Sequence, residues 1–407
     1  MRSVREAVTK EKRKHVDDLR GAGRLAVEAT RGVTDLVEAM HRNIASGPAM
    51  LGRPLEGPTR LLTGLVYGSI RGVTQAVGAG IDFALARLAP LLGESALGPE
   101  RDAALAALNG VLGDYLNETD NPLAIQMRLR HDGHTLELEP QSLRVAMPHA
   151  GATLLVLVHG SCRSDRHWSR LGHDHGAALA RDLGYTPVYL HYNSGLHVST
   201  NGRTFAALLE RLVAEWPVPL DELVILAHSM GGLVARSACH CAEAEGHLWR
   251  RKLRKLVCLG TPHHGAPLER GGSWVDHLLG ASSYSAPLAR LGKIRSAGVT
   301  DMRFGNVLDE HWKGRDRFAH AGDPRSRLKL PAGVACYAIA ATTAPQACAK
   351  LPSDGLVPVD SALGRHEKPE LTLGFPEAHQ WIGYGMGHLD LLNRAEVYAT
   401  IRRWLGS

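Results

Sequence analysis

Two features are scarce in this chain of 407 residues: paired cysteines and long apolar segments. The six cysteines include no Cys-x-x-Cys pair, which argues against a zinc ribbon or a thioredoxin-like site. No stretch reaches the roughly 18 uninterrupted apolar residues of a membrane-spanning helix. The N-terminus "MRSVREAVTKEKRKHVDDLR" also lacks the apolar segment of a secretory signal. We therefore expect a cytoplasmic location, with peripheral membrane contact left open, and no metal centre.

The overall composition is that of a globular protein, with 44% hydrophobic and 22% charged residues. Lysine and arginine number 47 against 41 acidic residues, which gives a formal net charge of +6. This mild excess permits attraction to anionic surfaces but does not require it. Because the basic residues are scattered, we predict no nucleic-acid partner. The oligomeric state stays open.

Residues 1–122 read as a helical N-terminal extension, because apolar and charged residues alternate there at helical spacing. "RGVTDLVEAM", starting at Arg31, and "RGVTQAVGAG", starting at Arg71, suggest a weak duplication of one helix. The second copy is either a helix docked on the rest of the protein or an amphipathic element on a membrane surface. Docking is favoured, because the polar face of this copy lacks lysine.

From residue 123 onward, short apolar runs alternate with helical patterns, which indicates a second domain, 123–407. An alternating segment with Asp132-Gly133 near its middle predicts a β-hairpin. The predicted strands are 153–158, 187–190, 223–227, 255–259 and 334–340. The predicted helices lie near 174–183, 202–215, 232–244 and 389–405. Fully apolar strands alternating with helices predict a mostly parallel α/β sheet with helices on both faces.

One serine lies where a predicted strand ends and a helix begins, in "LVILAHSMGGLVARS" (223–237). Ala227 and Gly231 are small enough for a sharp turn around Ser229. Ser229 is therefore either a plain turn residue or a nucleophile presented at the carboxyl edge of the sheet. The helix that follows would direct N–H groups toward the site, which favours a developing negative charge there.

A serine nucleophile needs a base, and the base needs an acid to orient it. In a sheet of this type the chain order is serine, acid, histidine. His388 follows the glycine-rich loop in "IGYGMGHLDLLNR", where the base is expected. Asp354 lies in the turn-rich "LPSDGLVPVDSALG", soon after a predicted strand, and we assign it as the acid. Asp360 and Asp390 compete for this role, and Asp360 would also suit a helix cap.

An oxyanion site needs two donors, and both can come from backbone N–H groups. The first is the N–H of Met230, the residue after the serine. The second comes from the loop in "LLVLVHGSCRSDRHW", where Gly160 lets the backbone approach a ligand closely. We predict the N–H of Ser161 as this donor, with Cys162 as the alternative. His159 is interpreted as a structural histidine of the same turn.

Residues 266–332 form a long insertion between two predicted strands. Such insertions are often functional, and this one is interpreted as a lid or cap over the site, rather than an excursion with its own small core. Its large apolar residues are Trp274, Leu278, Leu279, Tyr284, Phe304 and Trp312. The adjacent His263 and His264 are the strongest metal alternative, but neighbouring loop histidines rarely share one metal, so we interpret them as structural.

Five segments together resemble the α/β-hydrolase family, and specifically its lipase-like members. In chain order they read "VHGS", "AHSMGG", "LGTPHHGAP", "SDGLVPVDSA" and "GMGHLDLL", and the resemblance covers residues 150–407. "GTPHHGAP" is especially similar to bacterial triacylglycerol lipases and to GPI inositol-deacylase-like hydrolases. The resemblance implies the α/β-hydrolase fold and a catalytic triad of Ser229, Asp354 and His388.

The expected function is therefore a serine hydrolase that cleaves carboxylic esters through an acyl-enzyme on Ser229, with an ester or lipid-like substrate and no cofactor. Acyltransferase, thioesterase and amidase are alternatives that would use the same triad. A further alternative is a membrane-associated interaction protein with an inactive hydrolase domain. This alternative is suggested by the unusual N-terminal helices and by the mild excess of basic over acidic residues.

Overall fold

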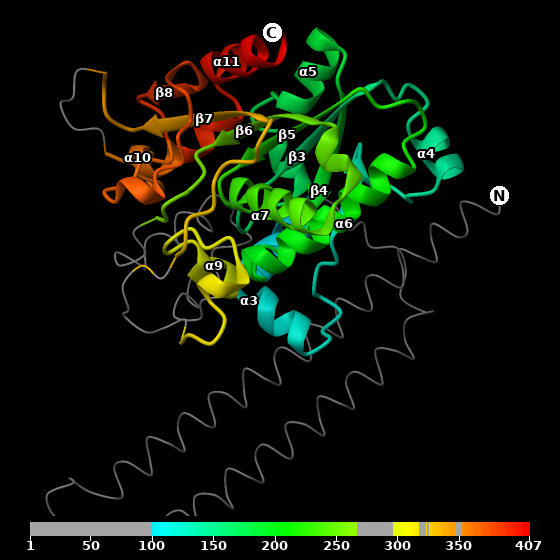
Figure 1. Ribbon diagram of the computed structural model, residues 1–407. Coiled ribbons are helices and arrows are strands. Elements are labelled where there is room, and N and C mark those ends of the chain that lie inside the picture. The colour runs from blue at the N-terminus through cyan, green and yellow to red at the C-terminus, as the bar shows by residue number, and fades with distance from the viewer. Residues whose placement is uncertain (1–98, 267–295, 317–322, 324, 347–351) are drawn as a thin grey trace, which may run out of the picture. The chain divides into compact units, whose positions relative to one another are not determined.

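The computed structural model describes residues 99–266, 296–316, 323, 325–346 and 352–407 (Figure 1). Most of the predicted N-terminal extension and the central part of the predicted lid lie outside the described residues. The chain forms two compact units. One contains Pro99–Tyr115 and Ile125–Ser407, and the described part of the other is Leu116–Ala124. The sheet and the candidate site described below lie in the first of these units.

The eight strands form one sheet in the order β2-β1-β4-β3-β5-β6-β7-β8. β1 pairs antiparallel with β2 and β4, and every other pairing is parallel. The bounds are β1 Arg128–His131, β2 His134–Thr135, β3 Thr153–Val158, β4 Thr186–His191, β5 Glu222–His228, β6 Leu253–Leu259, β7 Ala335–Thr342 and β8 Gln380–Tyr384. The predicted mostly parallel α/β sheet and the hairpin at Asp132-Gly133 are confirmed.

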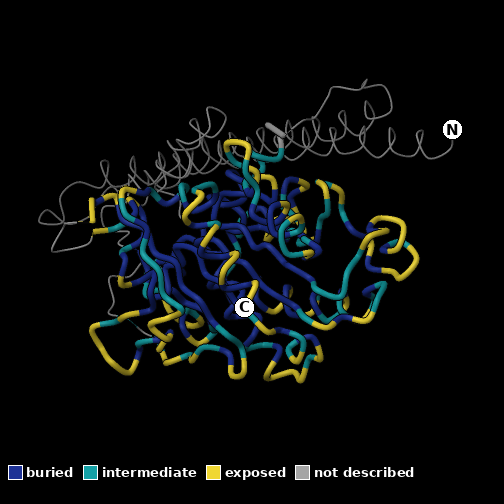
Figure 2. Tube along the Cα trace, turned by 90° about the horizontal axis from the view of Figure 1, so that it is seen from above, coloured by how far each residue is buried: buried dark blue, intermediate teal, exposed yellow. Residues whose placement is uncertain are grey.

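Helices cover both faces of this sheet (Figure 1). α6 (Val198–Ala214) and α7 (Met230–Glu245) pack against each other on one face. On the other face, α5 (His175–Leu183) and α11 (Ala395–Leu405) share a core with alternate residues of β3, β5, β6 and β7. The whole apolar run of β5 is buried, because this central strand has helices above and below it. The buried centre of the sheet is visible in Figure 2.

The remaining helices are short, apart from α3 (Pro99–Glu118). The α-helices are α4 Pro140–Ala146, α9 Ala297–Asp301 and α10 Val359–Ala362. The 3-10 turns are η2 Asp165–Trp168, η3 Leu248–Arg251, η6 Asp309–His311, η7 Pro369–Leu371, η8 Glu377–His379 and η9 His388–Leu392.

The prediction of one continuous helix over 389–405 is wrong, because η9 and α11 are separate. The Asp390 carboxylate accepts the N–H of Gly387 at 2.9 Å, which closes a tight turn at the start of η9. Asn393 then leaves the helical conformation with φ −142°. The apolar periodicity runs through this break, because both segments place leucines in the same core.

The first part of α3 packs on loops at the carboxyl edge of the sheet. The side chain of Asn193 donates to the Gly113 carbonyl at 2.8 Å, and the Ser296 hydroxyl donates to the Gly110 carbonyl at 2.7 Å. The N–H of Ala297 donates to Asp114 at 2.8 Å. Pro99–Tyr115 therefore belongs with the sheet-bearing unit, although the sequence pattern places it in the extension. The domain division at residue 122 itself stays a prediction.

Part of the predicted lid is described, at 296–316. The indole of Trp312 stacks on the His197 ring at 3.6 Å between centroids, and its Nε1–H donates to Ser199 at 2.9 Å. These contacts tie the segment to the start of α6. Trp274, Leu278, Leu279 and Tyr284 lie outside the described residues, so the lid role stays a prediction.

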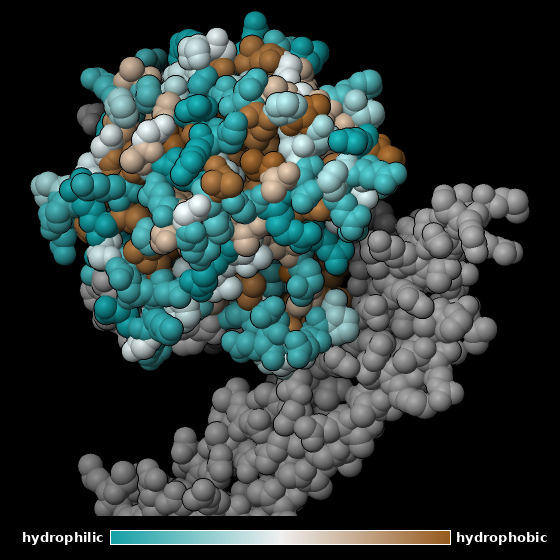
Figure 3. Space-filling view, turned by 45° about the vertical axis from the view of Figure 1, so that its right-hand side comes forward, coloured by the Kyte–Doolittle hydropathy of each residue, from teal (hydrophilic) through white to brown (hydrophobic). Residues whose placement is uncertain are grey.

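The surface of the described residues carries apolar side chains in several groups among hydrophilic ones, on the face drawn in Figure 3. Within the described part of the chain, no helix combines the length and the apolarity that crossing a bilayer needs.

The contact between α6 and α7 gives a first prediction. A methyl group at Gly202 would lie 2.5 Å from the Ser237 Cβ and 3.0 Å from its carbonyl carbon. Although alanine favours helix by about 1 kcal/mol, the overlap is expected to lower the free energy of unfolding of Gly202→Ala by about 1–3 kcal/mol. Urea unfolding measures this. The exposed Thr204→Ala on the same helix should change it by less than about 0.5 kcal/mol. A Gly202→Ala variant as stable as wild type would contradict the packing.

Candidate active site

Ser229 lies in a sharp turn between β5 and α7, at the carboxyl edge of the sheet. Its backbone has φ 56° and ψ −129°, a conformation that costs a non-glycine residue about 1–3 kcal/mol. The N–H of Ser229 donates to the Leu259 carbonyl at 2.8 Å, which fastens the turn to the end of β6. The side chain therefore leaves the sheet at a fixed position, as the sequence pattern predicts for a strand-turn-helix serine.

Close approach of neighbouring backbone explains the small residues around this turn. A Cβ at Gly231 would lie 2.5 Å from the Val158 carbonyl oxygen. A Cβ at Gly160 would lie 2.8 Å from the Ser229 Cβ. Real Cβ atoms do not approach so closely, so the loop after β3 can reach the serine only because both positions are glycine.

His388 and Asp354 are in direct contact, and both are buried. The Nδ1 of His388 lies 2.7 Å from an Asp354 carboxylate oxygen. The second carboxylate oxygen accepts the N–H groups of Leu356 and Val357 at 2.9 and 2.8 Å. Because a carboxylate only accepts, Nδ1 carries the proton and Nε2 presents its lone pair. That Nε2 is buried and has no hydrogen-bond partner among the described residues.

The edge of β6 brings the histidine to the serine turn. Leu259 holds the Ser229 N–H, and a Cβ on the next residue, Gly260, would lie 3.0 Å from His388 Cε1. The ring of His388 also lies 4.7 Å from the ring of His228, the residue before the serine. The Ser229 turn and the contact between Asp354 and His388 thus lie at the same edge of the sheet, around the ends of β5, β6 and β7.

The two competing carboxylates lie elsewhere. Asp360 is on α10 with a side chain that is 75% exposed, and it faces Arg365 at 3.7 Å. Asp390 is engaged by the Gly387 N–H at the start of η9. Neither contacts the His388 ring, whereas Asp354 does. Geometry therefore favours Asp354 as the partner of the histidine.

Two buried histidines bind backbone carbonyl groups of η9. His228 Nε2 lies 3.3 Å from the His388 carbonyl oxygen, and His175 Nε2 lies 2.9 Å from the Leu391 carbonyl oxygen. Since a carbonyl only accepts, both Nε2 atoms donate. Burial lowers the pKa of His228 well below its ordinary value and lowers that of His175 to about 4. Both rings are therefore neutral at pH 7, and they fix the turn that carries His388.

The N–H groups predicted to stabilise an oxyanion lie in the loop after β3 and at the start of α7. Ser161 is buried, and its N–H is not engaged by any other described residue. Met230 begins α7, where the first N–H groups have no acceptor within the helix. The alternative donor, Cys162, has φ 57° and gives its N–H to the Ser194 hydroxyl at 3.0 Å. His159 stacks on Tyr192 at 4.3 Å, and burial lowers its pKa to about 3.

Asn193 and Ser194 shape this loop, and the sequence analysis did not single them out. Ser194 accepts the Cys162 N–H, and Asn193 accepts the Gly195 N–H while donating to the Gly113 carbonyl of α3. The available signal was their position in "HYNSG", directly after the predicted strand 187–190, because strands of a parallel sheet end at the same edge.

A cavity of about 230 Å³ is lined by residues that are close in sequence to the proposed base and oxyanion loop, although Ser229, His388 and Ser161 are not among them. Its lining includes Leu389, which follows His388, and Arg163, which comes two residues after Ser161. Arg170 and Ala103 also line it, so that the start of α3 forms part of its wall. The wall combines apolar side chains with guanidinium groups, as in many pockets for small molecules.

The histidines considered as metal ligands are engaged by protein groups. His263 Nδ1 lies 3.4 Å from Arg236, and His264 Nε2 lies 3.0 Å from the Gly364 carbonyl. Across the described ranges, no group of three or more histidine, cysteine or acidic residues is arranged to hold a metal ion.

Residues 149–313 match the model of a family described as PGAP1-like alpha/beta domain. Among solved structures, the chain is similar to the Bacillus licheniformis lipase BlEst2 in its mature form, with 16% identity over 62% of this chain and 91% of that one, and a TM-score of 0.40. Aspergillus fumigatus lipase B has 13% identity over 67% and 59% of the two chains, with a TM-score of 0.40. The Pyrococcus furiosus esterase Pf2001 has 12% identity over 63% and 82%, with a TM-score of 0.37.

A comparison with curated proteins finds none whose sequence matches this chain. The family match and the order of strands in the sheet agree with the resemblance drawn from the sequence motifs. The α/β-hydrolase resemblance and fold are therefore confirmed. The catalytic roles of individual residues stay proposals.

The buried His175 gives a prediction on acid stability. Burial, partly offset by the Leu391 carbonyl, lowers its folded pKa from 6.5 to about 4. The unfolded chain therefore binds the proton more readily, so this stabilisation is complete above about pH 6.5 and is lost as the pH falls toward 4. His175→Gln keeps a donor for Leu391 but does not titrate. We expect the drop in unfolding free energy between pH 7 and 4.5 to shrink by about 2–3 kcal/mol.

Urea unfolding at the two pH values measures this difference. His134→Gln makes the same substitution at an exposed histidine of β2 and should keep the wild-type difference. An unchanged difference in His175→Gln would show that His175 is not held neutral by burial.

Proposed function

We propose that this α/β-hydrolase chain is a serine hydrolase that cleaves carboxylic esters, with Ser229 as nucleophile, His388 as base and Asp354 as the acid that orients the base. One observation carries the proposal. The buried Asp354 carboxylate holds His388 Nδ1 at 2.7 Å and leaves Nε2 without a partner among the described residues, at the edge where the Ser229 turn leaves the sheet. A serine nucleophile requires a base nitrogen of this tautomer that can accept its hydroxyl proton. His388 Nε2 makes no hydrogen bond to Ser229 Oγ in this structure, so the proposal requires the two atoms to come within hydrogen-bonding distance in the substrate complex.

In the first half of the reaction, the Ser229 oxygen attacks the ester carbonyl carbon while His388 Nε2 takes the hydroxyl proton. The carbonyl electron pair moves to its oxygen, and the N–H groups of Met230 and Ser161 stabilise that negative charge. When the tetrahedral intermediate collapses, the bond to the alcohol oxygen breaks. The protonated His388 gives its proton to the leaving alcohol, and the acyl group stays on Ser229.

In the second half, water replaces the alcohol. His388 Nε2 takes a proton from the water, whose oxygen attacks the acyl carbon. Collapse of the second intermediate breaks the bond to the Ser229 oxygen, which recovers its proton from His388, and the acid leaves. Asp354 stays ionised and stabilises the imidazolium formed in each half. Protein groups alone carry all these steps.

The substrate in this proposal is an ester or lipid-like small molecule. We place part of it in the cavity of about 230 Å³ whose lining includes Leu389 and Arg163, because these residues follow the proposed base and the proposed oxyanion donor Ser161 closely in sequence. The described part of 266–332 lies at the same end of the sheet, where a lid would act. A cytoplasmic location and peripheral membrane contact through the N-terminal extension belong to the same proposal, and vesicle flotation of the full chain tests the contact.

The same residues would also serve an acyltransferase, a thioesterase or an amidase. Product analysis separates these, because only a transferase forms a new ester when an alcohol competes with water. Matched oxygen ester, thioester and amide substrates of one acyl group identify the preferred leaving group. The interaction-protein alternative predicts no turnover of any of them.

The acid assignment gives a prediction with a matched control. Asp354→Asn keeps the shape of the side chain but removes the charge that fixes the His388 tautomer. We expect kcat for a p-nitrophenyl ester to fall about 10³- to 10⁴-fold, as for the equivalent change in serine proteases. Asp360→Asn, the same chemical change on the competing exposed residue, should leave kcat within about twofold.

Ser229→Ala should remove nearly all turnover while its circular dichroism spectrum and thermal midpoint stay those of wild type. If Asp360→Asn loses activity and Asp354→Asn does not, the acid is misassigned. Turnover retained by purified Ser229→Ala would rule out the acyl-enzyme mechanism.

A further inference from the structure

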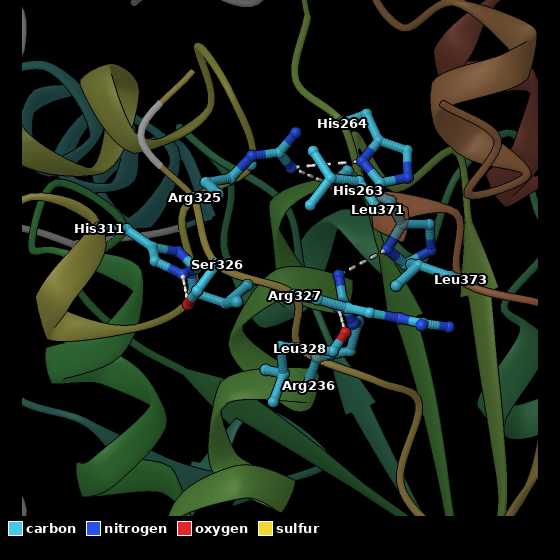
Figure 4. Close-up of a pocket in the computed structure, with 12 residues that line it drawn as sticks. Arg236, His263, His264, His311, Arg325, Ser326, Arg327, Leu328, Leu371 and Leu373 are labelled. Carbon is cyan, nitrogen blue, oxygen red and sulfur yellow. Dashed lines mark hydrogen bonds between the residues drawn. The ribbon is translucent and has the colours of Figure 1, made fainter. Parts of the chain in front are cut away.

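A small cavity lies away from the serine, between α7, the loop after β6 and the residues at 305–311 and 325–328 (Figure 4). Its volume is about 20 Å³, enough for roughly one particle of the size of water. His263 and His264 approach it from one side and His311 from the other. The lining contains three arginines, Arg236, Arg325 and Arg327, and no aspartate or glutamate.

Arg236 is the unusual member of this lining, because its guanidinium is only 4% exposed and faces no carboxylate among the described residues. One terminal nitrogen donates to the Leu328 carbonyl at 2.8 Å, and the other lies 3.4 Å from His263 Nδ1. Its Nε has no partner among the described residues. Burial and the nearby Arg325 lower the pKa of Arg236 only to about 10, so the group keeps its charge at pH 7.

His263 supplies a second buried donor without a partner. Its side chain is fully buried, and its Nδ1 faces the Arg236 guanidinium, which can only donate. The proton of the neutral ring is therefore on Nε2. That nitrogen has no hydrogen-bond partner among the described residues. A buried N–H without an acceptor is costly, and so is a buried charge without a counter-charge.

The other buried polar groups of the lining are engaged. Arg325 pairs with both carboxylate oxygens of Asp323, at 2.9 and 2.6 Å. His264 binds the Gly364 carbonyl, and His311 contacts the Ser326 hydroxyl at 3.2 Å. Arg327 is exposed, so water can solvate its charge. Arg236 is therefore the buried positive charge at this cavity that no carboxylate of the described residues balances.

We propose that the cavity binds one small monovalent anion, of the size of chloride or bromide, between Arg236 and His263. Such an ion would neutralise the buried guanidinium and accept the unpartnered N–H groups, which water can do only in part. The volume admits a halide, which is slightly larger than water, and excludes sulfate or an organic acid. Bound there, the ion would fasten the loop after β6 to the segment that contains Leu328.

The test is the thermal midpoint of the full chain at pH 7.5 and constant ionic strength, with sodium chloride replacing sodium gluconate. A ligand that binds only the folded state raises the midpoint in proportion to the logarithm of its concentration, once above its dissociation constant. For a dissociation constant of about 10 mM, we expect a rise of roughly 3–6 °C between 1 and 300 mM chloride. Bromide should act similarly, and sulfate should show no saturable effect.

Three variants separate binding at this site from a general salt effect. Arg236→Met removes the charge and should make the midpoint independent of chloride. Arg236→Lys keeps the charge and should keep a rise, shifted to higher chloride. Arg254→Met is the matched control, because it removes the charge of an exposed arginine on β6. It should keep the wild-type rise of the thermal midpoint with chloride. In crystals grown with bromide, anomalous difference density should lie within hydrogen-bonding distance of Arg236 and His263.

A wild-type midpoint that does not respond to chloride would overturn the proposal, as would an equal response in Arg236→Met. If Arg236→Met does not fold, the wild-type response and the bromide position decide. Bromide density absent from this cavity at saturating concentration would overturn it as well. None of these readouts depends on esterase activity.

Discussion

The left-handed turn at Ser229 is the constraint on which the rest of the site depends. β5 is followed by one residue at φ 56° and then directly by α7, and this sharp turn requires neighbouring backbone to lie very close to Ser229. Gly160 and Gly231 permit that approach, and the Leu259 carbonyl holds the turn by its N–H. The strain of about 1–3 kcal/mol at this residue is offset by a sheet whose central strands β3 and β5 are buried at every residue after the first. The proposed nucleophile thus lies at the end of a buried central strand.

The proposed base is held with comparable rigidity but by different means. His388 lies on a short 3-10 turn, which by itself would position a side chain poorly. The Asp354 carboxylate holds its ring, while His228 and His175 hold the carbonyls of its turn. These contacts hold the turn that carries His388 in place at the edge of the sheet where Ser229 lies. An anion bound in the separate cavity at Arg236 would similarly fix the loop after β6, which lies at the same edge of the sheet.

Much of this arrangement could be predicted from the sequence. Apolar runs bounded by turn residues indicated five of the eight strands, and small residues around Ser229 indicated the turn. β8, with the sequence "QWIGY", was missed because it is short and only half-buried, and because its glycine and the two that follow it resemble a loop. The break between η9 and α11 was missed because the helical periodicity does not record that the Leu391 carbonyl binds the buried His175, a residue far away in the sequence.

The sequence predicted which residues form the candidate site, but it did not predict the contacts that hold these residues in place. Chain order pointed to Asp354 over Asp360, and the contact with His388 agrees. The roles of Asn193 and Ser194, the docking of α3 and the unbalanced charge of Arg236 depend on contacts between segments far apart in the sequence. No local pattern encodes such contacts. The substrate is equally unreadable from local sequence, because loops from several elements build the pocket beside Leu389.

The central claim is that Ser229 is an activated nucleophile, and covalent labelling tests it most directly. Wild-type protein would be treated with a fluorophosphonate, digested, and its peptides analysed by mass spectrometry. The account predicts a single adduct on Ser229, which disappears when the protein is unfolded before treatment or carries His388→Ala. An adduct on another residue alone, or none on folded protein even in the presence of detergent or vesicles, would contradict it.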